Sequence, residues 1–231
     1  MGDGSAAGFG TRQPYDRVVT SLARTERAAL ADLLDDLGPD APTLCGDWRT
    51  RDLAAHLVVR ERRPDATPGV AVKALSGWTR SVQENYARRS HAELVELVRT
   101  GPGRLSPFAL PKVDTVFNTT EYAVHHEDVR RAQPGWAPRD LPLRSQDTLW
   151  KAVRTRAALS FRGVDVTVEL RRTDRPDVQP STHGSGDSTV TLAGEPLELL
   201  LYCFGRREHA RVQVTGAPKA INALRHHSLT V

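Results

Sequence analysis

The sequence has few cysteines and no long apolar segment. Its two cysteines, Cys45 and Cys203, are too few for the disulfide framework of a small secreted protein, so we expect free thiols in a reducing compartment. No apolar run approaches the roughly 18 residues of a membrane span. The first ten residues lack the basic and apolar segments of a signal peptide. These absences predict a cytoplasmic protein with no membrane partner.

Motifs for several common chemistries are also missing. The chain has no strand-linked dinucleotide-binding glycine motif, no Walker loop, no Gly-x-Ser-x-Gly elbow and no Cys-x-x-Cys pair. Nucleotide, acyl-serine and thioredoxin chemistry therefore lack support. The zinc-protease motif, in which a glutamate lies between two histidines four residues apart, is absent as well.

The charge is positive overall but is not concentrated in one region. The 32 Lys and Arg residues exceed the 28 Asp and Glu residues by four, and the pI is near 9.4. Because acids interrupt the basic residues along the whole chain, and no nucleic-acid-binding motif occurs, we expect no nucleic-acid partner. The positive charge is typical of a solvated surface, or of a cleft for an anionic small substrate.

Possible metal ligands are densest in residues 114–132. Read as a helix, this segment places five polar residues on one face, namely Asp114, Asn118, Glu121, His125 and Asp128. The neighbouring apolar face should pack inward, so the polar stripe borders the core. His56 lies upstream on a second predicted helix, over 50–62. Together, His56, Glu121 and His125 would form a site with two histidines, one carboxylate and an open position.

The same residues also have an ordinary structural interpretation. A glutamate and a histidine four residues apart form a common helix-surface pair worth a few tenths of a kcal/mol, and His56 could be a core histidine bonded to a carbonyl. Cys45 lies in a loop before a helix, where its pKa could be lowered, but no histidine flanks it in the sequence. Cys203 lies in an apolar stretch and is expected in the core.

Helical periodicity predominates up to about residue 162. It predicts helices over 15–37, 50–62, 70–89, 90–99, 114–133 and 144–161, with a loop over 101–111. The sequence Ser90-His-Ala-Glu93 is a capping box. Short connections favour an up-and-down four-helix bundle over residues 14–162, preceded by a disordered tail over 1–13.

The pattern changes after residue 163 to an alternation of period two. Strands are predicted over 164–170, 188–193 and 211–215, helices over 195–204 and 217–224, and a polar loop over 171–187. The expected fold class is therefore an N-terminal helical bundle followed by a small α+β module over residues 163–231.

Three stretches of the chain resemble a known family. They are PTLCGDWRTRDLAAH at 42–56, EYAVHHED at 121–128 and GEPLELLLYCFGR at 194–206. On these residues the chain resembles the actinobacterial branch of the DinB-like superfamily that includes mycothiol-dependent maleylpyruvate isomerase. The resemblance covers nearly all of residues 15–225. More narrowly, it looks like an uncharacterised subgroup that is described only as metal-binding. Residues 58–65 and 125–136 are the most specific stretches of that likeness.

The resemblance implies a DinB-like bundle that binds a divalent metal through His56, Glu121 and His125, which match the family's ligand positions. It also implies a low-molecular-weight thiol such as mycothiol as cosubstrate. The isomerase uses an arginine of its C-terminal module; Arg206 matches that position best, with Arg207 as the alternative. The segment between the two ligand helices is shorter than in the isomerase, so the isomerase's particular substrate is not carried over.

Three functions stay open at this stage. In the first, the metal activates a mycothiol-like thiol for S-transfer to, or cis-trans isomerisation of, an electrophilic small molecule; Arg206 orients a carboxylate, and His126 and Asp128 support the metal or relay a proton. In the second, the metal activates water for hydrolysis with Asp128 as base. In the third, the metal site is structural or regulatory.

The histidine and carboxylate ligands accept zinc, our first expectation, or nickel, manganese or iron. A monomer or homodimer is expected.

Overall fold

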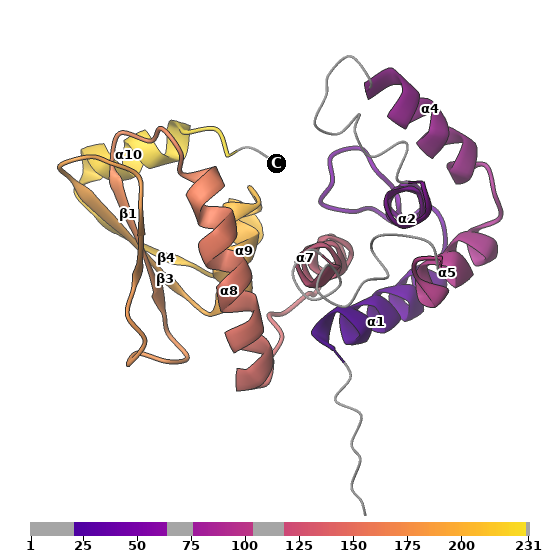
Figure 1. Ribbon diagram of the computed structural model, residues 1–231, viewed down its shortest axis with the longest axis horizontal. Helices are drawn as coiled ribbons and strands as arrows, with labels where there is room; N and C mark the ends of the chain where they lie inside the picture. Colours follow the sequence, from indigo (N-terminus) through magenta and orange to yellow (C-terminus); the bar gives the residue numbers. More distant parts are fainter. Residues whose placement is uncertain (1–20, 64–75, 104–117, 230–231) are drawn as a thin grey trace, which may run out of the picture.

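A computed structural model describes residues 21–63, 76–103 and 118–229. Figure 1 shows a helical N-terminal part on the right and a C-terminal part that contains the sheet on the left. The predicted tail over 1–13 and the Asp114 end of the polar stripe lie outside the described residues. The helical part comprises α1 (Leu22–Leu37), α2 (Thr50–Arg62), α4 (Ser76–Ala87), α5 (His91–Thr100) and α7 (Thr119–Arg130).

Helix ends in this part follow local side-chain chemistry. The Ser21 hydroxyl accepts a hydrogen bond from the N–H of Arg24 and caps α1. The Ser90 hydroxyl accepts one from the N–H of Glu93, at 3.2 Å, and caps α5 as its sequence predicts. These bonds pair backbone donors that the first turn of a helix otherwise leaves free.

The N-terminal core is a closed apolar cluster between α1, α2, α5 and α7. Leu30 and Leu34 of α1 lie in one cluster with Leu53 of α2, Leu94 of α5 and Tyr122 of α7, and all five are fully buried. Burial of these side chains fixes which face of α2 and α7 points inward. No described helix is both long enough and apolar enough to cross a membrane.

The C-terminal part combines three helices with a small sheet. These are α8 (Leu143–Ser160), β1 (Thr167–Arg172), β2 (Ser181–His183), β3 (Thr189–Gly194), α9 (Pro196–Cys203), β4 (Gln213–Gly216) and α10 (Pro218–His226). The strand order is β2-β1-β3-β4; β1 and β3 are parallel and the other pairs are antiparallel. Val168 pairs with Val190 and Leu170 with Leu192, and all four are buried, so one face of the sheet belongs to the core.

The fold class predicted from the sequence, a helical N-terminal part with a small α+β module, is confirmed. The predicted loop over 171–187 is wrong in part, because it contains β2. That strand has only three residues and no buried side chain, so it carries no periodic apolar signal.

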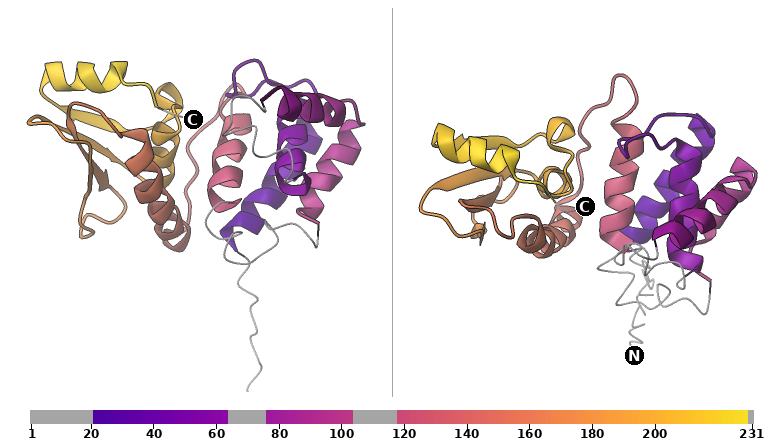
Figure 2. Two further views of the ribbon diagram at one scale, coloured as in Figure 1. Left: turned by 45° about the horizontal axis from the view of Figure 1, so that its top comes forward. Right: turned by 90° about the horizontal axis from the view of Figure 1, so that it is seen from above.

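The packing of α8 differs from expectation. This helix was expected to complete the bundle, but its buried residues Val153 and Ala157 share a core with the sheet and with α9. Figure 2 shows α8 and α9 between the sheet and the helical part. The predicted boundary near residue 162 therefore divides elements that pack together. We propose a boundary in the connection over 131–142 instead.

Buried ion pairs join the two parts of the chain. Arg131, at the end of α7, is 2% exposed and binds both carboxylate oxygens of Glu198 on α9, at 2.6 and 2.8 Å. It also donates to Glu127 and to the carbonyl of His209. A bidentate contact of this kind fixes relative orientation as well as distance.

Replacing Arg131 tests this connection. Arg131→Met would leave Glu198 buried without its bidentate partner and Glu127 with one partner fewer, and we expect it to lower the free energy of unfolding by about 3–5 kcal/mol in urea denaturation. The control Arg89→Met breaks an exposed pair with Glu93 and should cost under about 1 kcal/mol. Equal effects of the two substitutions would contradict the assigned role of Arg131.

Candidate metal centre

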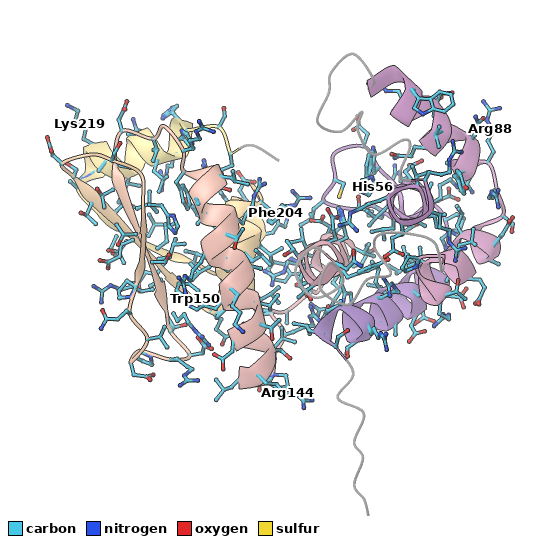
Figure 3. The ribbon with its side chains drawn as sticks, viewed as in Figure 1. His56, Arg88, Arg144, Trp150, Phe204 and Lys219 are labelled. Carbon is cyan, nitrogen blue, oxygen red and sulfur yellow. The ribbon has the colours of Figure 1, made fainter. Side chains whose placement is uncertain are left out.

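His56 is positioned by the start of α2 and by the loop before it. The Asp52 carboxylate accepts a hydrogen bond from the N–H of Arg49 at 2.9 Å, which fixes the first turn. The loop is tied down by a bridge between Pro42 and Arg49. The Trp48 ring lies 5.1 Å from the His56 ring, centroid to centroid. Figure 3 labels His56 on α2.

Glu121 and His125 lie one turn apart on α7 and face His56. The Nε2 atom of His125 is 3.1 Å from Oε2 of Glu121, and the rings of His56 and His125 are 5.5 Å apart. Each of the three residues offers one ligand atom, and these atoms all lie within 4.8 Å of one another. The structure thus brings together the three residues expected as ligands; their role as ligands stays a prediction.

The electrostatics keep His56 neutral and Glu121 charged. Burial, together with the nearby charge of His125, lowers the pKa of His56 to about 4. Burial opposes ionisation of Glu121, but contacts with His125 and Arg60 outweigh it and hold its pKa well below the usual range. The Nε atom of Arg60 is 3.4 Å from Oε1 of Glu121. A neutral imidazole and a carboxylate are the forms in which these groups bind metals.

The other nitrogen of His125 is held by Asp128. Its Nδ1 atom is 3.0 Å from Oδ2 of Asp128, whose side chain is fully buried. Arg206, just beyond α9, binds Asp128 through two parallel hydrogen bonds, from Nε at 2.8 Å and from Nη2 at 2.7 Å. These contacts with His125 and Arg206 outweigh burial and hold the pKa of Asp128 well below its usual range. A chain of polar contacts therefore runs from the C-terminal module to the candidate ligands.

Cys45 is a member of the site that sequence reasoning missed. Its Sγ atom lies 3.1 Å from Oδ2 of Asp128, 3.7 Å from Nδ1 of His125 and 3.6 Å from Nη2 of Arg206. The backbone N–H of Leu44 donates to the carbonyl of Asp128 at 3.0 Å, which holds the Cys45 loop against α7. Cys45 and His125 are 80 positions apart in the sequence, so no local sequence pattern predicts their contact.

His126 and Arg207 lie apart from this group. The Nδ1 atom of His126 is 2.8 Å from the Glu26 carboxylate on α1, and Arg139 binds the same carboxylate. Arg207 donates to the backbone carbonyls of Arg225 and His227 near the C-terminus. The expected relay through His126 therefore has no contact with the candidate ligands, and Arg207 serves the packing of the C-terminal module.

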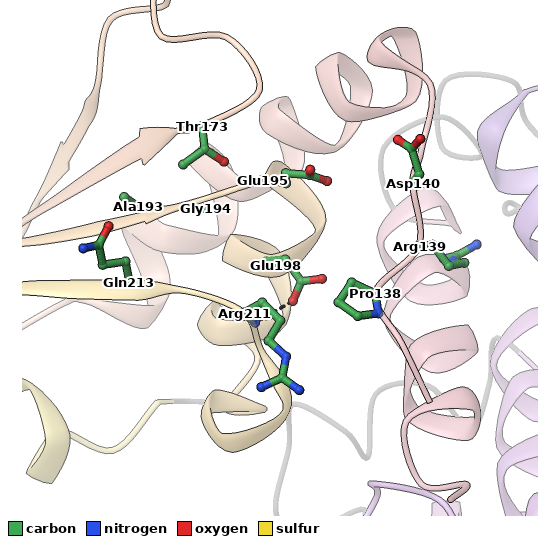
Figure 4. Close-up of a pocket in the computed structure, with 10 residues that line it drawn as sticks. All are labelled: Pro138, Arg139, Asp140, Thr173, Ala193, Gly194, Glu195, Glu198, Arg211 and Gln213. Carbon is green, nitrogen blue, oxygen red and sulfur yellow. Dashed lines mark hydrogen bonds between the residues drawn. The ribbon is translucent and has the colours of Figure 1, made fainter. Parts of the chain in front are cut away.

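Cavities in the described part of the chain lie outside the cluster itself. Figure 4 shows one of about 470 Å³ between the connection after α7 and the sheet, with Glu198 and Arg211 in its wall and none of the candidate ligands. Another, of about 420 Å³, is lined by Leu44, Phe204 and Arg206. The second cavity lies beside the candidate metal centre, because Arg206 in its wall contacts both Asp128 and Cys45.

The donor set of His56, Glu121 and His125 fits a divalent metal. Ligands 2.0–2.2 Å from a tetrahedral ion lie roughly 3.4 Å apart, so the observed spacing needs only small side-chain adjustments. The contact between Asp128 and His125 has the form in which a carboxylate orients a metal-binding histidine.

A second set, Cys45, His125 and Asp128, also lies within 4.8 Å. Its carboxylate is already neutralised by the Arg206 guanidinium, whose positive charge opposes a cation at that position. The set that contains His56 and Glu121 is therefore favoured.

Comparison with known proteins agrees with this fold. Residues 21–109 match the family model of the mycothiol maleylpyruvate isomerase N-terminal domain. The fold is similar to the crystal structure of a mutant of the mycothiol-dependent maleylpyruvate isomerase, with a TM-score of 0.54 and 14% identity over 84% of this chain and 90% of that one. No curated protein sequence matches the chain.

The chain thus has a fold that joins a helical N-terminal part to a small α+β module. Over residues 21–109 it is similar to the N-terminal domain of the mycothiol maleylpyruvate isomerases, as its sequence motifs predict. The likeness to the narrower metal-binding subgroup stays a prediction.

The two candidate ligand sets make different predictions for metal binding. His56→Ala and Glu121→Ala each remove a ligand of the favoured set and should weaken zinc affinity by more than about 100-fold, measured by competition with a chromogenic chelator. Cys45→Ala removes a ligand of the second set only and should cost no more than about tenfold. A larger loss in Cys45→Ala than in His56→Ala would assign the ion to the second set.

Zinc binding should also depend on pH through His125. Burial opposes its charged form, but contacts with Asp128, Cys45 and Glu121 outweigh burial and raise the pKa of His125 well above its usual value. Below that pKa an incoming ion must displace a proton, so affinity should rise with pH by about tenfold per unit until the pKa is passed. His56 has a pKa of about 4 and is already neutral at pH 7, so it releases no proton when zinc binds.

Calorimetry in two buffers of different ionisation enthalpy measures this proton. We expect about one proton released for each zinc ion bound at pH 7. Release of none would show that His125 is neutral before binding, and release of two would show that His56 is protonated too.

Proposed function

We propose that the protein is a metal-dependent enzyme that activates a low-molecular-weight thiol, such as mycothiol, for attack on an electrophilic small molecule. The reaction is either transfer of the thiol or cis-trans isomerisation by addition and elimination. The observation that carries the proposal is the convergence of His56, Glu121 and His125, with Asp128 bound to the far nitrogen of His125. The family match over residues 21–109 supports the same choice of thiol.

The three ligand residues account for the metal requirement. Imidazole and carboxylate together suit zinc, nickel, manganese or iron. A divalent ion with these three protein ligands supplies an open position and a lowered pKa for a thiol, so that a thiolate is available at neutral pH.

Residues around the three candidate ligands hold His125 in place. Asp128 fixes the His125 ring so that Nε2 points toward Glu121. Arg206 keeps Asp128 ionised, and its three guanidinium nitrogens all have partners, since Nη1 donates to the carbonyl of Phe204 at 2.6 Å. We therefore infer that Arg206 acts on the reaction through Asp128 and His125; its expected contact with a substrate carboxylate stays a prediction.

Hydrolysis with Asp128 as general base has less support. A base needs a carboxylate oxygen that can reach a water molecule. Both Asp128 oxygens are bound by Arg206, Oδ2 also contacts His125 and Cys45, and the residue is 0% exposed. Asp128 is suited to hold a histidine and unsuited to accept a proton from solvent.

An activity assay tests the proposal. Zinc-loaded protein is mixed with mycothiol and either maleylpyruvate or 1-chloro-2,4-dinitrobenzene, as probes for isomerisation and thiol transfer. We expect turnover of at least one probe at more than about 100-fold above the protein-free rate, with an absolute need for both thiol and metal. His56→Ala should abolish turnover, whereas the exposed control His226→Ala should not.

Two results would contradict the proposal. Turnover that continues without thiol would point to hydrolysis. Zinc that stabilises the fold, with no conversion of either probe, would point to a structural or regulatory metal.

A further inference from the structure

Arg60 of α2 ties the two helices that carry the candidate ligands to each other. It follows His56 by four residues, so the two side chains leave the same face of α2 one turn apart. The Arg60 side chain is only 12% exposed. Its Nη1 atom donates to the Oδ1 atom of Asn118, which is fully buried at the start of α7, at 2.8 Å. This bond anchors the guanidinium beside Glu121, about one turn further along α7.

The two carboxylate oxygens of Glu121 face different partners. Oε1 lies 3.4 Å from Nε of Arg60, and Oε2 lies 3.1 Å from Nε2 of His125. The other carboxylate of the site is held differently, because Arg206 binds both oxygens of Asp128, at 2.8 and 2.7 Å. Arg60 therefore occupies only one oxygen of Glu121 and leaves the second directed at a candidate ligand.

The number of oxygens that Glu121 supplies decides how many positions remain at an ion. With both oxygens bound, Glu121 and the two histidines fill all four positions of a tetrahedral site. With one oxygen bound they fill three, and the fourth is left for a small ligand. The positive charge of Arg60 beside Oε1 repels a cation, so it favours an ion at Oε2.

We propose that Arg60 is a positioning residue that reserves Oε1 of Glu121 and so restricts this carboxylate to one oxygen toward the ion. Arg60 thereby keeps a coordination position open, and it lowers the affinity for the ion because its charge lies beside the site. The inference rests on the proposed function for the use of that position by a thiol. The way in which Glu121 binds the ion is independent of turnover.

Crystal structures of the zinc-loaded protein test the binding mode of Glu121. In the wild type, Oε2 should lie about 2.0–2.2 Å from the ion and Oε1 should stay on Arg60. In Arg60→Met, both oxygens should lie at bonding distance. Arg62→Met removes the same charge from α2, where Arg62 donates to Thr100 and to the carbonyl of Gly101 at the end of α5, and it should keep the wild-type mode. A single bonded oxygen in Arg60→Met would overturn the proposal.

Zinc affinity separates this role from a purely structural one. Arg60→Met should bind zinc at least about tenfold more tightly in the chelator competition, because a repelling charge is lost. Arg62→Met should keep the wild-type affinity. A folded Arg60→Met protein with affinity no higher than the wild type would overturn the proposal. Arg60→Gln loses the charge but keeps an amide that can donate to Asn118, so it supplies the same test if the methionine variant does not fold.

Mycothiol added to the cobalt(II)-loaded protein separates the inference from the proposed function. A thiolate in the open position should add a sulfur-to-cobalt charge-transfer band to the wild-type spectrum, and Arg60→Met should bind mycothiol at least about tenfold more weakly. Equal mycothiol affinity in the two proteins would contradict an open position that depends on Arg60. If the wild type shows no such band, the proposed function fails, and the crystal structures still decide how Arg60 acts on Glu121.

Discussion

The ion pair between Arg206 and Asp128 is the contact on which the candidate site depends. Asp128 is fully buried on α7, and Arg206 reaches it from the C-terminal module with two parallel hydrogen bonds. The Oδ2 atom of the same carboxylate also holds His125 and contacts Cys45. Without the arginine, a buried carboxylate beside these groups would lose its main counter-charge. The geometry of His125, and with it the candidate metal centre, therefore depends on how the two parts of the chain dock.

The docking surface combines a small apolar contact with several buried charges. Ala123 and Val124 of α7 belong to the same apolar core as the C-terminal sheet. Around them, Arg131 joins Glu127 to Glu198, and Arg139 joins Glu26 to Glu127. Paired charges of this kind specify one relative orientation, because a small shift breaks a bidentate contact without offering another. A surface that fixes orientation suits a site whose supporting residues come from both sides.

Local elements of this fold were predictable from sequence because their signals are local. Ser90 and Glu93 predict the start of α5, and alternation of apolar and polar residues predicts β1 and β3. The triad of His56, Glu121 and His125 was anticipated from helical spacing and from family motifs, and the structure brings the three residues together.

Features that depend on tertiary contacts were not predictable in the same way. The buried residues of α8 have the spacing of any amphipathic helix, so periodicity did not reveal that it packs on the sheet instead of in the bundle. Cys45 and Arg206 approach Asp128 from 83 and 78 positions away, and neither pairing has a sequence pattern.

The most direct test of the account is anomalous X-ray diffraction at the zinc edge from crystals grown with zinc. We predict one peak within about 2.0–2.2 Å of ligand atoms from His56, Glu121 and His125, with one coordination position free of protein atoms and with Asp128 still bound to His125. A peak between Cys45 and Asp128, or an ion enclosed by four protein ligands, would contradict the account.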